Sequence, residues 1–96
     1  MIRLVKMTFE EAYVEDFKYL FETIKNKIAA CEGCNHLRLL QDEALPEIFF
    51  TYSMWESQQD LDAYRYSDLF KTTWTKIKPW FADKPEAWSV QEINSI

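Results

Sequence analysis

The sequence predicts an α+β domain of the ferredoxin-like type, in which helices cover one face of a four-stranded antiparallel sheet. The first observation is the order of patterns: alternating apolar segments and segments with a helical period follow one another as β-α-β-β-α(α)-β. The second is the length, because 96 residues are enough for one domain and too few for two. With no repeat and no linker in the chain, residues 1–96 are expected to form a single domain.

The first half of the chain is expected to form a strand followed by a helix. The segment Ile2–Phe9 alternates weakly between apolar and other residues, as a strand does. From about Val14 to Ala30 the pattern changes to the spacing of an amphipathic helix, with apolar residues at Phe17, Leu20, Phe21, Ile24 and Ile28. Gly33, the only glycine, follows this stripe at a point where a left-handed residue that ends a helix is favoured.

Two strands are expected next, joined as an antiparallel hairpin. Asn35–Gln41 is the first candidate, and the polar segment Asp42–Pro46 connects it to the second. The second, Ile48–Trp55, is rich in aromatic and β-branched residues, which favour strands. We therefore expect an aromatic strand near the middle of the chain.

Two short helices and a last strand complete the prediction. Ser57 and Ser67 can each accept a hydrogen bond from a first-turn N–H, which predicts one helix over Gln58–Tyr66 and another after Ser67. The second helix is expected to end or kink at Pro79, which disfavours the helical conformation in the residue before it. Ala87–Ile93 alternates and is the fourth strand candidate.

The faces of Ile48–Trp55 predict how the domain associates. Ile48, Phe50, Tyr52 and Met54 share one face, and Phe49, Thr51, Ser53 and Trp55 share the other. Helices can cover only one of these faces. In addition, 48% of the residues are hydrophobic and 17% are aromatic, which is more large apolar surface than a core of this size easily hides. We therefore expect a homodimer formed through the open sheet face, with the two sheets facing each other.

Charge and hydropathy exclude several classes of partner. The chain has 16 acidic and 11 basic residues and a net charge of −5, so it lacks the positive surface that binds nucleic acid or anionic lipid. No apolar run approaches the roughly 20 residues that span a bilayer. We expect no nucleic-acid partner and no membrane association, and a cytoplasmic location.

The pair Cys31 and Cys34 forms a C-x-x-C motif with His36 two residues later, which admits a redox or metal site. A redox C-x-x-C opens a helix, whose positive end lowers the thiol pKa, whereas this one closes a helix. A zinc site would also need a second ligand pair. We therefore expect free thiols and no bound metal.

Three short motifs resemble those of the antibiotic biosynthesis monooxygenase-like domains of the dimeric α+β barrel superfamily. They are Glu32-Gly33-Cys34, Trp55-x-Ser57, and Leu61-x-Ala63-Tyr64-x-x-Ser67-x-x-Phe70. They occur in order and span nearly the whole chain. The resemblance implies a dimeric α+β barrel with a pocket between helices and sheet. It also implies a cofactor-independent oxygenase that acts on a small aromatic or quinol-type substrate.

The chain departs from this family at several positions. Many members have histidine where this chain has Tyr64, and often glutamate where it has Ser53. The branch that degrades haem is characterised by an asparagine near Val5, a tryptophan at Tyr64 and a ligating histidine at Trp74, all three of which are absent. We therefore expect no cofactor, and a non-catalytic dimeric protein that binds a ligand or assists another protein remains the alternative.

The candidate site residues are mainly aromatic. Tyr64 and His36 are the candidates for catalysis, His36 because it is the only imidazole in the chain. Arg38 and Arg65 could stabilise an enolate or phenolate, or could simply lie on the surface. The candidates for stacking on a flat substrate, which could equally be core or dimer contacts, are Tyr52, Trp55, Tyr66, Phe70 and Trp74.

Overall fold

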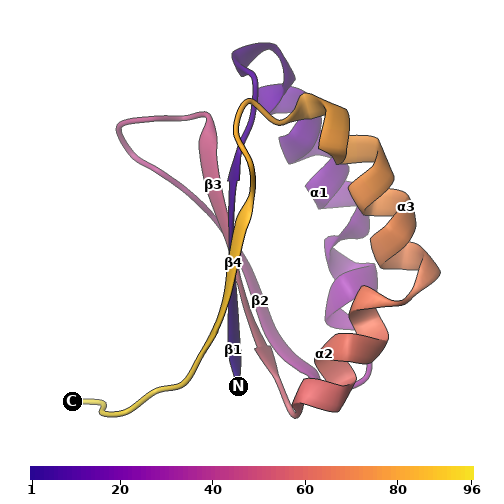
Figure 1. The fold of residues 1–96 in the computed structure, drawn as a ribbon, viewed down its shortest axis with the longest axis vertical. Coiled ribbons are helices and arrows are strands. Elements are labelled where there is room, and N and C mark those ends of the chain that lie inside the picture. Colours follow the sequence, from indigo (N-terminus) through magenta and orange to yellow (C-terminus); the bar gives the residue numbers. More distant parts are fainter.

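The computed structural model describes residues 1–96 and confirms the ferredoxin-like arrangement of strands and helices (Figure 1). Four strands and three α-helices alternate in the expected order, and two short 3-10 helices adjoin α1 and α3. The elements are β1 (Ile2–Thr8), η1 (Glu11–Tyr13), α1 (Val14–Ala29), β2 (Cys34–Gln41), β3 (Ile48–Trp55), α2 (Gln58–Arg65), α3 (Asp68–Ile77), η2 (Lys78–Trp80) and β4 (Glu86–Val90).

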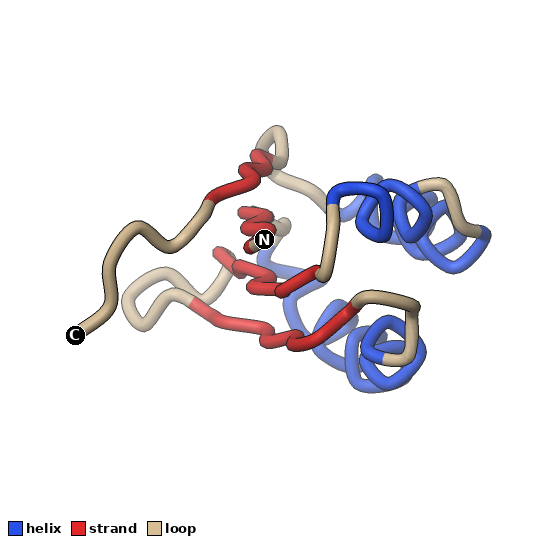
Figure 2. Tube along the Cα trace, turned by 90° about the horizontal axis from the view of Figure 1, so that it is seen from below, coloured by secondary structure: helices blue, strands red, loops and turns tan.

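The four strands form one antiparallel sheet in the order β2-β3-β1-β4. Figure 2 shows that the helices all lie on one side of this sheet. The two central strands place Val5 opposite Thr51 and Leu4 opposite Tyr52, so the parity of each residue decides whether it faces the helices. The sheet therefore has a covered face and an open face.

Two strand ends differ from the prediction. β1 ends at Thr8, and Phe9 makes only an isolated bridge to Phe81. β4 covers residues 86–90 instead of 87–93, because its only neighbour is β1 and the register reaches the start of β1 where Val90 lies opposite Ile2. Residues 91–96 consequently have no strand to pair with and extend away from the body of the domain (Figure 1).

The turn after α1 also differs in detail. Gly33 has a left-handed backbone with φ of 80°, as its position suggested. However, α1 ends at Ala29 and its C-cap is Ala30, so Gly33 does not end the helix but shapes the turn into β2. Its carbonyl oxygen accepts a 2.7 Å hydrogen bond from the N–H of Glu56, which joins this turn to the segment before α2.

The helix ends in the second half follow the serines and the proline as predicted. The Ser57 hydroxyl accepts a hydrogen bond from the Asp60 N–H at 3.1 Å, and the Ser67 hydroxyl accepts one from the Phe70 N–H at 3.2 Å. α3 passes into a 3-10 turn that contains Pro79. None of the three α-helices has the length and apolar character needed to cross a membrane.

The core lies between α1 and the covered face of the sheet. Phe9 stacks on Phe17 with ring centroids 4.3 Å apart, and both rings contact Phe49 edge-on. Leu20, although on the predicted stripe, is only partly buried. The remaining buried members of this cluster are Met7, Val14, Phe21, Ile24, Ile28 and Ile77.

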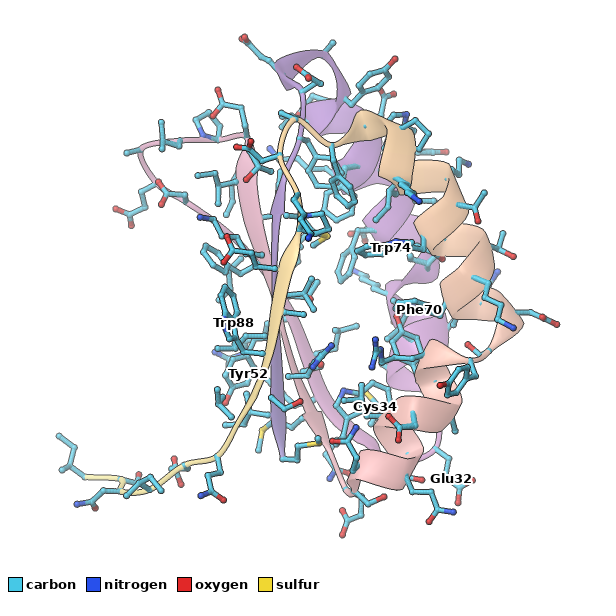
Figure 3. All side chains as sticks on the ribbon, viewed as in Figure 1. Glu32, Cys34, Tyr52, Phe70, Trp74 and Trp88 are labelled. Carbon is cyan, nitrogen blue, oxygen red and sulfur yellow. The ribbon has the colours of Figure 1, made fainter.

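The open face of the sheet is largely apolar and lies in solvent. Tyr52 and Trp88 point away from the helices in Figure 3, and Trp88 is 42% exposed. The strand register places further apolar side chains around them, at Ile2, Leu4, Leu40, Phe50, Met54 and Val90. This set of eight residues is called the open-face patch below.

Candidate active site

A cavity of about 320 Å³ lies between the covered face of the sheet and the helices. Fourteen of its 21 lining residues are hydrophobic. The strands β1, β2 and β3 supply one wall, the three α-helices supply the other, and the segment from Pro85 to Ala87 borders one side. An apolar cavity with a few polar groups is the usual form of a small-molecule site.

Aromatic rings form a continuous wall of this cavity. Trp55 on β3 stacks on Tyr64 of α2 with centroids 5.1 Å apart and an interplanar angle of 22°. Tyr64 meets Phe70 edge-on at 5.3 Å, and Phe70 stacks on Trp74 at 5.7 Å. Figure 3 shows Phe70 and Trp74 directed from α3 toward the sheet. The caps described above set this geometry, because they fix where α2 and α3 begin.

A buried polar pair lies at the sheet end of this wall. The indole N–H of Trp55 donates a 2.9 Å hydrogen bond to the hydroxyl oxygen of Ser53. The Ser53 hydroxyl in turn donates a long, 3.5 Å hydrogen bond to the carbonyl oxygen of Arg3. Ser53 thus orients Trp55, and its hydroxyl group is already occupied by protein partners.

Tyr64 is the one tyrosine that lines the cavity, and its phenol lies close enough to Cys31 and Cys34 for their charges to act on it. Burial, together with the negative charges that Cys31 and Cys34 would carry as thiolates, raises the pKa of this phenol well above its ordinary value of 10. Tyr64 therefore stays protonated near neutral pH and can donate a hydrogen bond, but it cannot act as a base there. No hydrogen bond within the protein uses its hydroxyl group, so this donor is available to a ligand that reaches it.

Arg3 and Arg65 are the cations that line the cavity. Arg3 lies on β1, on the same face as Val5 and Met7, and its Nη1 donates a 3.0 Å hydrogen bond to the hydroxyl of Ser89. Desolvation lowers the pKa of Arg3, and the positive charge of Arg65 lowers it further. Arg65 ends α2 and reaches the cavity from the helix side.

The cysteines lie at the turn between α1 and β2, and both thiols are free. Cys31 contacts the carbonyl oxygen of Lys27 at 3.4 Å and Cys34 that of His36 at 3.8 Å. The pKa of each thiol is raised, which is the direction expected for thiols at the end of a helix. The main cause, however, is burial of the thiols. No cluster of three or more His, Cys, Asp or Glu side chains has the arrangement that could hold a metal ion.

Comparison with known proteins identifies the family. The family model for antibiotic biosynthesis monooxygenase matches residues 1–76. The chain belongs to this family. A search of curated proteins found no match to this monooxygenase-family domain.

Solved structures of antibiotic biosynthesis monooxygenases share the fold. A proposed member from Nitrosomonas europaea superposes with a TM-score of 0.90 at 16% identity, covering 96% of this chain and 88% of the other. The structure of another antibiotic biosynthesis monooxygenase superposes with a TM-score of 0.89 at 14% sequence identity, covering 98% of this chain and 100% of the other. The structure of a conserved protein from Methanosarcina mazei superposes with a TM-score of 0.83 at 25% sequence identity, covering 90% of this chain and 86% of the other.

Five of the sequence-predicted site residues come together at the cavity, namely Arg65, described above, and four aromatic residues. Trp55, Tyr64, Phe70 and Trp74 all line the cavity, although they come from three different elements. Trp74, which the sequence resemblance aligns with a haem-ligating histidine, packs its ring against Phe70 and Phe81. An indole has no lone pair to offer iron, so these residues do not fit haem ligation.

The other four predicted site residues do not reach the cavity, and their placement corrects the prediction. His36, Arg38 and Tyr52 lie on the open face, because their parity along β2 and β3 is opposite to that of Leu37, Leu39 and Trp55. There Arg38 Nε donates to His36 Nε2 at 2.6 Å, and the His36 ring meets Tyr52 edge-on. Tyr66, two residues after Tyr64 at the end of α2, points outward and is 76% exposed.

Sequence reasoning missed Arg3 and Glu86 as cavity residues. The signal for Arg3 was present, because it alternates in phase with Val5 and Met7, which face the helices. Glu86 is an exposed residue that borders the cavity where the chain enters β4, and the register places it opposite Lys6, so its side chain belongs to the open face. No sequence signal marked it, since its place depends on the path from η2 to β4.

Proposed function

We propose that this domain binds a small, flat aromatic molecule in the cavity and oxygenates it without a cofactor. The observation that carries the proposal is the wall of four rings, Trp55, Tyr64, Phe70 and Trp74, with the free Tyr64 hydroxyl among them. Small-molecule cavities range over about 300–1,000 Å³, so this one at about 320 Å³ suits one or two fused rings. Stacking on the wall would orient such a ring.

The reaction proposed is that of a phenol with dioxygen to give a quinone and water. A ring carbon exchanges its hydrogen for one oxygen atom, the hydroxyl group loses its proton, and the second oxygen atom leaves as water. The substrate supplies the four electrons that reduce dioxygen. In this scheme Tyr64 donates a hydrogen bond to the substrate oxygen, and the apolar walls keep bulk water from the reacting carbon.

We also propose that two copies of the domain associate through the open-face patch. An antiparallel sheet can leave one face in water, but that face is then normally polar, whereas here eight apolar residues occupy it. Stable obligate interfaces usually bury about 2,000 Å² or more, and a sheet face packed on its copy provides an area of this kind.

Sedimentation velocity tests this association with a matched pair of variants. Trp88→Glu introduces a charge into the patch and is expected to give a folded monomer or a much weaker dimer. Tyr19→Glu changes a ring that is 76% exposed on α1, on the helical side, and should leave the dimer unchanged. A monomeric unmodified protein at micromolar concentration would contradict the proposal.

The second candidate function is a dimeric protein that binds an aromatic ligand without turning it over. One observation favours it: neither an imidazole nor a carboxylate lies among the rings, because His36 is on the open face and Glu86 is exposed at the cavity's side. Removal of a phenolic proton normally needs a positioned base with a pKa near the working pH.

Oxygen uptake separates the two functions. The probe is 1-naphthol, with uptake measured at an electrode and 1,4-naphthoquinone followed by absorbance, on protein treated with a chelator. The oxygenase proposal expects equal oxygen consumption and quinone formation. It also expects Tyr64→Phe to reduce turnover by about tenfold or more, the effect of losing one positioned donor, while Tyr66→Phe leaves it unchanged. Binding without oxygen uptake would support the second candidate, and no binding would overturn both.

A further inference from the structure

We propose that the molecule bound in the cavity is an aromatic acid whose carboxylate is held by Arg3 and Arg65. This inference rests on the proposed function of the cavity as an aromatic-binding site. It adds the chemical class of the substrate, which becomes a hydroxylated aromatic carboxylate with its rings on the aromatic wall and its charge at the arginines.

The two guanidinium groups approach the cavity from opposite walls. Arg3 comes from β1 in the sheet, and Arg65 comes from the end of α2. They are close enough for the charge of Arg65 to act on Arg3. Guanidinium groups match the geometry of a carboxylate and hold it with paired, charge-assisted hydrogen bonds.

Neither arginine has a carboxylate partner in the protein. The ion pairs of the fold are Lys18 with Glu15 and Lys25 with Glu22, all on α1. Arg3 uses one N–H on Ser89, and Arg65 makes no side-chain hydrogen bond at all. Most cations of the chain are likewise unpaired, and Arg65 is exposed, so what sets these two apart is that both line the cavity.

Two acidic residues close to this region, Asp62 and Glu86, do not occupy the arginines. The negative charge of Asp62 raises the pKa of Arg3, but Asp62 forms no ion pair with either arginine. Its carboxylate instead accepts a 2.8 Å hydrogen bond from Gln58 Nε2. Glu86 borders the cavity, but the register places its side chain on the open face, opposite Lys6, and it forms no ion pair with either arginine. Two like charges beside an apolar cavity repel each other and keep unused donors, and a bound carboxylate would relieve both.

The hydrogen bond from Arg3 to Ser89 offers a purely structural reason for Arg3, because it joins β1 to β4. That reason does not extend to Arg65, whose side chain makes no hydrogen bond. A test must therefore use both residues and must measure something that fold stability alone does not change.

The experiment compares 2-naphthoate with 2-naphthamide, which has the same rings without the charge. Binding is followed by calorimetry at pH 7, where the naphthoate carboxyl is ionised, on the unmodified protein and on Arg3→Lys, Arg3→Gln and Arg65→Gln. Arg38→Gln, on the opposite face of the sheet, is the matched control. Circular dichroism confirms that each variant is folded.

We expect naphthoate to bind about tenfold or more tightly than naphthamide, as one or two charge-assisted hydrogen bonds provide. Arg65→Gln and Arg3→Gln should remove this preference without changing naphthamide affinity, Arg3→Lys should keep part of it, and Arg38→Gln should have no effect. Equal affinities for the two ligands, or losses shared by both, would overturn the inference and leave the aromatic site intact. Failure of both ligands to bind would instead overturn the proposed function.

Discussion

Replacing Gly33 by alanine should destabilise the domain strongly for two reasons that can be separated. The backbone at Gly33 has φ of 80°, a region that costs a non-glycine residue about 1–2 kcal/mol. A Cβ added there would also lie 2.5 Å from the Cβ of Asp60, in the first turn of α2. Relief of that overlap must move Asp60, whose N–H and carboxylate both bond to the Ser57 cap.

The expected loss follows from these two parts. Loss of an N-cap costs about 0.5–2 kcal/mol, so the sum for Gly33→Ala is about 1.5–4 kcal/mol. Small domains have a total free energy of unfolding of about 5–15 kcal/mol, so the effect is large. For a domain of this size each 1 kcal/mol corresponds to a fall of about 4–8 °C in Tm.

Urea unfolding of a set of variants distinguishes the parts. Gly33→Asn should lose less than Gly33→Ala, because asparagine tolerates the left-handed region but still carries a Cβ. In a double-mutant cycle, Asp60→Gly should recover more of the Gly33→Ala loss than Asp60→Ala does, because alanine removes the overlapping Oδ2 and Cγ atoms but keeps the overlapping Cβ. Equal coupling with both Asp60 variants, or a loss below about 0.5 kcal/mol, the range of ordinary surface changes, would refute this reasoning.

Three further outcomes are expected. Ser53→Ala should cost about 1–3 kcal/mol in urea unfolding, because the buried Trp55 N–H loses its acceptor; a neutral result would mean that water replaces the hydroxyl. Replacing Cys31 and Cys34 together by serine should keep ligand binding and any oxygen uptake, with modestly reduced stability, and zinc found in the unmodified protein at one equivalent would contradict this. Because the pKa of Tyr64 is higher in the folded chain than the ordinary 10 of the unfolded chain, its contribution to stability is complete below pH 10 and declines as the pH rises above it. Tyr64→Phe should therefore flatten the fall in unfolding free energy above pH 10, and an unchanged slope would count against it.

Local rules were sufficient to predict the elements of the fold. Ser57, Ser67 and Pro79 fixed the ends of α2 and α3, since capping and proline geometry depend only on nearby residues. The end of β4 could not be predicted in this way. Residues 91–93 continue the alternation, but a strand also needs a neighbour, and β1 has ended by then.

The candidate site was predicted in part. Trp55 and Tyr52 cannot line one cavity, because residues three apart on a strand face opposite sides, and this could have been deduced from the alternation alone. Arg3 was likewise within reach of that rule. The closeness of Arg3 to Arg65 was not, because it depends on how α2 packs over β1, and no local pattern encodes that distance.

The strand order β2-β3-β1-β4 has a consequence for how the chain folds. β2 and β3 are joined by a short turn, so they can pair at little cost in loop entropy. β1, in contrast, must find β3 across about forty residues and β4 across about eighty. The contact between β1 and β4 is therefore the slowest to become favourable. Until residues 86–90 leave the ribosome, the outer edge of β1 presents unpaired backbone groups, and during that interval the nascent domain is most exposed to mispairing with another chain.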